Sequence, residues 1–411
     1  MSSLELPILP QRWSCHSCGQ CCRNYTVPVT HEERERITAQ GWAEEPDFAG
    51  QPLFIHNAAL DGEVLAERPD GACVFLDEAG RCRIHTRFGE AAKPLGCRMY
   101  PFVFNRVAGR NFVSLRFDCP SVAHSRGQPV ADRRRELGRL GNEVVAARNS
   151  PALAFRNADT LPESHLIAAA QAFEWIIADG SLELTRRILA GVNLAELLRN
   201  CDLTKVAELD RMREFLHLAS DVVIADARAD PLDRHAPGRL VATMFRTTLA
   251  LYARRDRHDA ERQSKLSQVA GTLLGAGRVP QWQPDLPAVK FRDLEVSFGA
   301  LPDDVTDLLS RNLRSKLGGL GFFGPAFHGF PLLEGLGALL LAAPLTLWFA
   351  RLFAVGEGRQ TLTLDDAARA LAIVEGPWGR RAVFRLPTER AHHAKLAEQP
   401  HLRSLLLWYG T

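Results

Sequence analysis

Four cysteines occupy positions 15, 18, 21 and 22, within the segment CHSCGQCC near the N-terminus. Three thiolates at C-x2-C-x2-C spacing on a tight loop can converge on one metal centre, and bacterial ferredoxins use this spacing for iron–sulfur ligands. C-x2-C pairs also hold structural zinc. Eight of the nine cysteines precede residue 120, which is typical of a metal site rather than of buried core thiols. The eight predicted metal ligands are Cys15, Cys18, Cys21, Cys22, Cys73, Cys82, Cys97 and Cys119.

The cellular compartment and the number of cysteines bear on which metal is bound. The opening MSSLELPILPQRWSC has neither a basic n-region nor an apolar h-region, so it lacks the pattern of a signal peptide. We therefore expect a cytoplasmic protein, in which thiols stay reduced and a cysteine cluster binds metal instead of forming disulfides. Eight cysteines exceed what one four-coordinate centre needs, which favours an iron–sulfur cluster and leaves zinc as the alternative.

Cys21 and Cys22 are adjacent, and both would close a small strained ring if they bound one ion. Neighbouring side chains diverge in extended backbone, so we expect the two sulfur atoms to point apart and to serve two centres. One centre would use Cys15, Cys18, Cys21 and Cys119, and the other Cys22, Cys73, Cys82 and Cys97. The alternative is that Cys22 is a buried spacer thiol. His16 and His85, beside cysteines, are alternative ligands or surface imidazoles.

Three segments, CHSCGQCCR, CVFLDEAGRCRIH and KPLGCRMYPF, resemble in this order the CxxCxxCC family, the YkgJ-type zinc- or iron-chelating domain. The family also includes flagellin lysine N-methylases, which this chain resembles in length and in having a Cys-rich N-terminus before a helical body. The resemblance implies that the eight cysteines bind metal. The methylase branch would imply a [4Fe–4S] cluster and S-adenosylmethionine-dependent methyl transfer to a protein lysine. His85 replaces the usual Tyr, and Lys93-Pro94 replaces the usual R-P.

The sequence predicts a mainly α protein with two parts. Residues 1–125 would form a small, irregular Cys-rich metal domain with short strands, whose folding depends on metal, and residues 126–411 an all-α body. CVFLDEAGRCRIH predicts two short strands around a turn, and NFVSLRF predicts another strand. Thr30 and Glu33 form a capping box at the start of a helix.

Apolar residues at helical spacing predict the helices of the body. These cover residues 162–178, 182–198, 202–223, 238–255, 260–274, 303–316, 331–355 and 365–374. Within them, Gly335–Ala350 is apolar and uncharged, but it is too short for a membrane span and contains Pro344. We expect a buried core helix there and no transmembrane span, with contact to a membrane surface through 335–350 as the alternative.

The remaining charge patterns, glycine motifs and isolated histidines and cysteines give weaker indications of function. The net charge of +2 gives no general attraction to nucleic acid, so we expect no nucleic-acid partner. GLGFFG (319–324) matches G-x-G-x-x-G, the dinucleotide-binding fingerprint, which should directly follow a strand. Here it follows a helical stretch, so we expect a turn that ends a helix. Glycines that let backbone approach a ligand are the alternative. His392 and His393 are expected at the surface, and Cys201 in the core or at a helix end. Arg98 and Tyr100 would donate to cluster sulfurs or form a packing turn.

Three functions remain open from the sequence. The first is an iron–sulfur methyltransferase that acts on a protein lysine. The second is a non-enzymatic zinc- or iron-chelating or electron-transfer module whose helical body docks a partner protein. The third is a structural zinc protein, in which metal replaces the core that a loop-rich domain lacks. No catalytic residue and no binding site for S-adenosylmethionine is identifiable.

Overall fold

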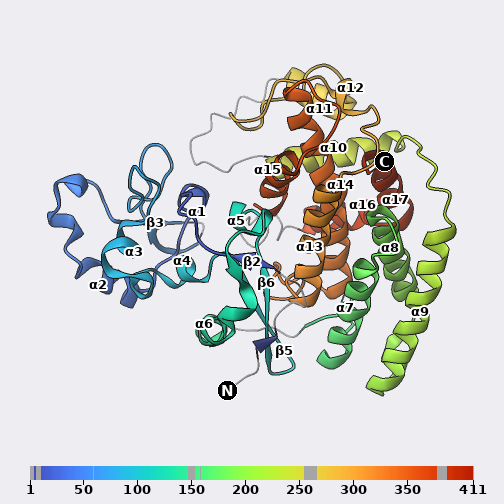
Figure 1. Cartoon of the computed structure of the whole chain (residues 1–411), viewed down its shortest axis with the longest axis horizontal. Helices are drawn as coiled ribbons and strands as arrows, with labels where there is room; N and C mark the ends of the chain where they lie inside the picture. The colour runs from blue at the N-terminus through green and yellow to red at the C-terminus, as the bar shows by residue number, and fades with distance from the viewer. Residues whose placement is uncertain are drawn as a thin grey trace.

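The computed structural model describes residues 4–5, 11–58, 60–146, 153–157, 159–253, 266–376 and 387–410. Within these ranges the protein is mainly α-helical, and its short strands lie in the N-terminal part (Figure 1). The predicted fold class is therefore confirmed.

The N-terminal part combines short helices with three small sheets. Its α-helices are α1 (Gln20–Asn24), α2 (His31–Thr38), α3 (Arg83–Phe88), α4 (Leu95–Met99) and α5 (Pro120–Ala123). Its strands are β1 (Leu4–Glu5), β2 (Arg12–Trp13), β3 (Phe54–Asn57), β4 (Gly62–Leu65), β5 (Phe102–Val107), β6 (Arg110–Leu115) and β7 (Gln128–Pro129). Short 3-10 helices are η1 (Trp42–Glu44), η2 (Pro46–Phe48), η3 (Glu90–Ala92) and η4 (Val130–Arg133).

The body is built from longer helices. They are α6 (Arg134–Ala146), α7 (Glu163–Ala178), α8 (Leu184–Asn200), α9 (Leu209–Ala229), α10 (Arg239–Ala253), α11 (Leu266–Leu274), α12 (Phe291–Leu294), α13 (Asp303–Gly318), α14 (Leu332–Gly356), α15 (Leu364–Glu375), α16 (Pro387–Leu396) and α17 (Gln399–Tyr409), with η5 at Leu203–Lys205. The helix predicted over 202–223 thus begins only at Leu209. Parts of two predicted helices, 254–255 and 260–265, lie outside the described residues.

The predicted strand at NFVSLRF is confirmed as β6. It pairs antiparallel with β5 and parallel with β1. Val107 pairs with Arg110, so Ala108 and Gly109 form a two-residue turn, and both have positive φ angles as a type I′ hairpin requires.

Buried apolar side chains form two clusters. The smaller contains Ile37, Trp42, Phe48, Leu53, Leu65, Ala66, Cys73, Val74, Phe75 and Ile84. We call the segment around it, residues 14–100, the cysteine lobe. The larger cluster joins the helices of the body to β5, β6 and Trp13. The two strands therefore pack with the body although they precede residue 125, and the domain boundary at 125 remains a prediction.

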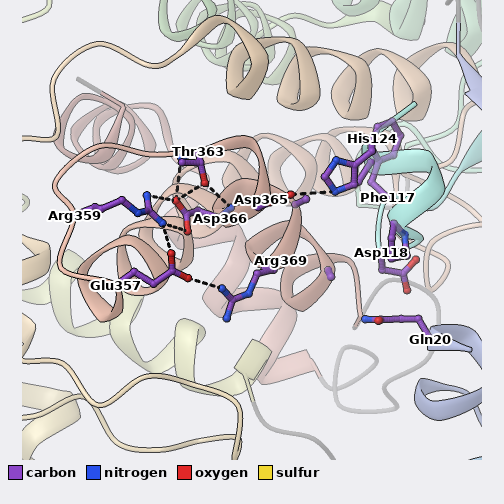
Figure 2. Close-up of a pocket in the computed structure, with 14 residues that line it drawn as sticks. Gln20, Phe117, Asp118, His124, Glu357, Arg359, Thr363, Asp365, Asp366 and Arg369 are labelled. Carbon is purple, nitrogen blue, oxygen red and sulfur yellow. Dashed lines mark hydrogen bonds and ion pairs between the residues drawn. The ribbon is translucent and has the colours of Figure 1, made fainter. Parts of the chain in front are cut away.

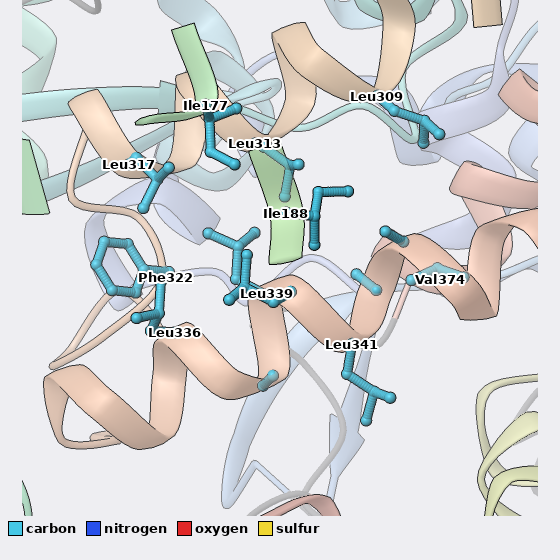
Figure 3. Close-up of a cluster of buried hydrophobic side chains, with 14 of the residues drawn as sticks. Ile177, Ile188, Leu309, Leu313, Leu317, Phe322, Leu336, Leu339, Leu341 and Val374 are labelled. Atoms are coloured by element: carbon cyan, nitrogen blue, oxygen red, sulfur yellow. The ribbon is translucent and has the colours of Figure 1, made fainter. Parts of the chain in front are cut away.

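Helix α14 is the centre of the larger core. All of Gly335–Ala350 is buried, and α8, α13, α15 and α17 pack around the helix. Figure 3 shows Leu336 and Leu339 of α14 among side chains of neighbouring helices. In the described part of the chain α14 alone is long and apolar enough to span a membrane by length and composition, but 94% of its most apolar window is buried inside the protein. The predicted core helix is confirmed, and 335–350 leaves no exposed surface for membrane contact.

The glycines of GLGFFG allow the turn after α13 to approach the backbone of β6 closely. As expected, the turn follows a helix, α13. A Cβ atom at Gly319 would lie 2.3 Å from the carbonyl oxygen of Val113, and one at Gly321 would lie 2.1 Å from Ser114 Oγ. The turn after α13 therefore packs directly on β6, and larger side chains would separate the body from the sheet.

The expectation that His392 and His393 lie at the surface is wrong for His393. It lies on α16, is 3% exposed, and its Nδ1 and Nε2 lie 2.8 Å from the Glu389 carbonyl oxygen and 3.3 Å from the Tyr252 hydroxyl. Neither α16 nor α17 was predicted. PTERAHHAKL has few apolar residues, and its burial comes from contact with α10 and α14, which local sequence does not encode.

His393 should make the protein less stable in acid. Burial lowers the pKa of His393 to about 4, whereas an unfolded histidine titrates near 6.5. Between these values the unfolded state binds more protons, so this contribution to stability is complete above about pH 7 and is lost as the pH falls. We expect it to reduce the free energy of unfolding by about 2 kcal/mol between pH 8 and pH 5. Urea unfolding at both pH values checks this. His393→Gln should weaken the pH dependence by that amount, and equal slopes for both proteins would contradict it.

Candidate metal centre

The loop that carries the first cysteines is folded onto a turn of the second cysteine segment. Gly19 has a φ of 68° and precedes α1, which carries Cys21 and Cys22. A Cβ atom at Gly80 would lie 2.9 Å from the carbonyl oxygen of Ser17. This close approach places the CHSCGQCC loop against the turn between Cys73 and Cys82.

The predicted hairpin at CVFLDEAGRCRIH is wrong, although its turn is present. Asp77 Oδ1 accepts a hydrogen bond of 2.7 Å from the Arg81 amide, and Leu76 and Cys82 form a single isolated bridge. Arg83 then begins α3 instead of a strand. The side-chain hydrogen bond closes the segment into a tight loop, which leaves no length for paired strands.

Backbone and side-chain hydrogen bonds bring the other cysteines to the same place. The Cys73 amide donates to the Cys22 carbonyl oxygen at 2.7 Å. The predicted capping box is present, and the same Glu33 carboxylate also accepts from the Leu95 amide at 2.6 Å. Glu33 thereby ties α2 to the start of α4, which carries Cys97.

Five thiols gather in what we call the cysteine cluster: Cys21, Cys22, Cys73, Cys82 and Cys97. The sulfur atoms of Cys21 and Cys22 lie 3.9 Å apart, so the prediction that they point apart is wrong. The short α1 brings both side chains to one side, where extended backbone would have separated them. Cys73 and Cys97 are also close enough to Cys82 and Cys21 for negative charge on those thiols to raise their pKa values.

Burial raises the pKa values of three thiols of the cluster, Cys73, Cys82 and Cys97, and so disfavours their charged forms. It raises the pKa of Cys73 to about 12 and that of Cys97 well above its usual value. The pKa of Cys21 is raised first by its hydrogen bond with Cys22 and then by burial. The Lys93 ammonium opposes these shifts for Cys21, Cys82 and Cys97.

The cluster fits a metal that binds thiolates. A metal ion would stabilise the charged form that burial disfavours, and binding would release protons. Among the described residues, no three His, Cys, Asp or Glu side chains already have the spacing of a metal site. Closing the site therefore requires the thiols to move.

The remaining predicted ligands lie outside the cluster. Cys15 and Cys18 are exposed on the loop. Cys119 is buried in the larger core, and burial raises its pKa to about 11. Burial raises the pKa of Tyr100 well above its usual value, and negative charge on Asp118, Cys119 and Cys21 adds to this shift, so the tyrosine lies near both cysteines. The assignment of eight ligands to one or two centres remains a prediction.

Residues that neighbour the cysteines have other partners. The His16 Nδ1 atom lies 2.8 Å from Ser121 Oγ, and His85 is exposed on α3. Arg98 pairs with Glu143, and the Tyr100 hydroxyl donates to Asp118. Both contacts favour the packing role over hydrogen bonds to sulfur. Cys201 is the residue directly after α8. The predicted position at a helix end, one of two predicted for this cysteine, is therefore the one observed.

A cavity of about 500 Å³ lies beside the cysteine loop, and motif analysis missed it (Figure 2). One wall contains Gln20, which precedes Cys21, and the segment from Phe117 to His124. The other wall is α15 and the loop before it, where charged side chains form a network. Arg359 pairs with Glu357 and Asp366, Arg369 pairs with Glu357, and His124 lies 3.5 Å from Asp365. No sequence signal marks this cavity, because its walls are far apart in the chain.

A lobe of short helices around a cluster of buried cysteines, joined to a large helical body, defines a metal-binding protein of the mainly α class. Comparison with known proteins identifies the lobe. Residues 14–120 match the CxxCxxCC family, described as "Putative zinc- or iron-chelating domain". The resemblance is therefore confirmed over this region, and with it metal binding, while residues 121–411 lie outside the match. No curated protein and no solved structure matches the chain, and the relation to flagellin lysine N-methylases is not supported.

Proposed function

We propose that the cysteines of residues 14–120 bind iron as an iron–sulfur cluster of the [4Fe–4S] type. The observation that carries the proposal is the cysteine cluster itself. Five thiols from three separate segments gather there, and two more are exposed on the same loop. A zinc ion and a [4Fe–4S] cluster each take four ligands, so the number of thiols does not choose between them. The C-x2-C-x2-C spacing of Cys15, Cys18 and Cys21, which bacterial ferredoxins use for cluster ligands, favours the cluster. The proposed ligands come from the eight predicted cysteines, Cys15 to Cys119, which supply enough thiolates for two such clusters.

The metal content of anaerobically purified protein tests the proposal. We expect brown protein that contains iron and acid-labile sulfide, with the broad visible absorption of an iron–sulfur cluster. Cys97→Ser should lower the iron content, whereas Cys201→Ser, outside the lobe, should leave it unchanged. Colourless protein with stoichiometric zinc and no sulfide would contradict the proposal.

Two uses of such a centre remain candidates. In the first, the protein is a cytoplasmic methyltransferase that transfers a methyl group from S-adenosylmethionine to a protein lysine. The cavity beside Gln20 supports this use, because its volume lies in the range of small-molecule sites and the largely exposed Asp365 carboxylate suits a cationic ligand. In the second, the lobe is a metal-chelating or electron-transfer module, and the helical body from about residue 126 docks a partner protein without nucleic acid.

Calorimetry on metal-replete protein separates the two uses. Binding of S-adenosylmethionine that weakens in Asp365→Asn would support the methyltransferase. Asp365 lines the cavity and is largely exposed, so its substitution should leave the fold intact. Absence of binding would favour the non-enzymatic module.

A further inference from the structure

Asp118 is a buried carboxylate that accepts hydrogen bonds from three side chains. Its residue is 9% exposed. Arg116 contacts both of its oxygens, with Nε 3.2 Å from Oδ1 and Nη2 2.9 Å from Oδ2. The Tyr25 hydroxyl donates to Oδ2, and the Tyr100 hydroxyl donates to Oδ1 at 3.4 Å. We call these four residues the Asp118 clamp.

Each member of the clamp is attached to a cysteine segment. Tyr25 is the C-cap residue of α1, three residues after Cys22. Tyr100 is the residue that ends α4, which contains Cys97. Asp118 itself precedes Cys119. One carboxylate therefore joins three of the chain segments that carry predicted ligands.

The short helices need this kind of anchor. Five-residue helices such as α1 and α4 are not stable in isolation, so tertiary contacts must fix their ends. The rings of Tyr25 and Tyr100 pack edge to face at 4.9 Å, and the Arg116 guanidinium lies 5.0 Å from the Tyr25 ring centre. These contacts fix the angle between the two helices.

The clamp is also held by the body. Arg116 Nη2 donates a hydrogen bond of 3.2 Å to the backbone carbonyl oxygen of Glu375, at the end of α15. Asp118 lines the cavity, and Figure 2 places it on the same side as Gln20 and opposite the network of Arg359. The clamp thus sets the position of the cysteine segments relative to α15.

We propose that Asp118 is a positioning residue of the metal centre, which holds α1, α4 and the Cys119 turn so that their thiols are preorganised for metal. It acts through the two tyrosines and does not touch the metal. The proposal rests on metal binding by the lobe and applies to iron and zinc alike.

Anaerobic titration of the metal-free, full-length protein with Co²⁺ tests the proposal, because cobalt–thiolate absorption reports both affinity and ligand geometry. Asp118→Asn keeps the size of the side chain but removes its charge. We expect it to weaken Co²⁺ binding about 10- to 100-fold, as for other residues that orient ligands, and to change the absorption band. Tyr100→Phe should weaken binding less, by about three- to ten-fold, because it removes one hydrogen bond.

Asp230→Asn is the matched control. Asp230 also contacts an arginine, Arg403, through both oxygens, but it lies in the body. Its substitution should leave Co²⁺ affinity and the absorption band unchanged. Equal affinity and band in Asp118→Asn and wild type would overturn the proposal, as would an equal loss in the control.

Two further outcomes concern a variant that does not fold and a protein that assembles no iron–sulfur cluster. If Asp118→Asn does not fold by circular dichroism, Tyr25→Phe and Tyr100→Phe carry the test, and unchanged Co²⁺ binding in both would overturn the proposal. If wild-type protein binds Co²⁺ and the variants bind it more weakly, but no iron–sulfur cluster can be assembled, the iron–sulfur proposal fails and the role of Asp118 stands.

Discussion

Removing the bound metal with a chelator should loosen the cysteine lobe while the larger core stays folded. The cysteine lobe has few long helices and only a small apolar cluster, so metal binding supplies much of the folding free energy of residues 14–100. We expect amide hydrogen exchange in the lobe to accelerate more than about ten-fold. Hydrogen-exchange mass spectrometry with and without metal measures this directly.

The structure also predicts where the loosening ends. Strands β5 and β6 precede residue 125, but their side chains belong to the larger core, and the turn at Gly319 packs on β6. Both strands should therefore keep their protection. Equal protection of residues 14–100 in the two states would contradict metal-dependent folding, and loss of protection throughout the body would contradict the separation of the two cores.

Substituting one member of the Lys316–Glu375 pair should strongly destabilise the body. The Lys316 Nζ atom lies 2.9 Å from Glu375 Oε2, and both side chains are 1% exposed. Asn312 donates to the other carboxylate oxygen at 3.0 Å. Lys316→Met would leave a buried carboxylate without its counter-charge, which costs about 3–5 kcal/mol. Urea unfolding measures the loss.

A double substitution separates the charge effect from packing. Because Lys316→Met together with Glu375→Leu removes both charges, it should be less destabilising than the sum of the two single substitutions. The exposed pair of Arg213 and Asp210 provides the control, and Asp210→Asn should change stability by less than about 0.5 kcal/mol. Additive losses in the double variant would show that the two charges do not stabilise each other.

Local patterns in the sequence determined much of the architecture. The capping box of Thr30 and Glu33 and the predicted body helices, α7 to α11 and α13 to α15, depend on residues within one or two turns of each other, which a single sequence displays. The cysteine spacing likewise pointed to a metal, because C-x2-C-x2-C needs only one tight loop. Helix α16 was not predicted, because its burial depends on contact with distant helices and not on its own polar sequence.

The tertiary structure alone decided which cysteines meet and what holds them. Cys21 and Cys22 lie on one short helix with their sulfurs together, a local conformation that adjacent letters do not reveal. Tyr25 and Asp118 lie outside the motif segments, yet folding brings the hydroxyls of Tyr25 and Tyr100 to the Asp118 carboxylate. Such contacts depend on the packing of segments about 90 residues apart, whose relative positions are set by the sum of many weak interactions rather than by any local preference.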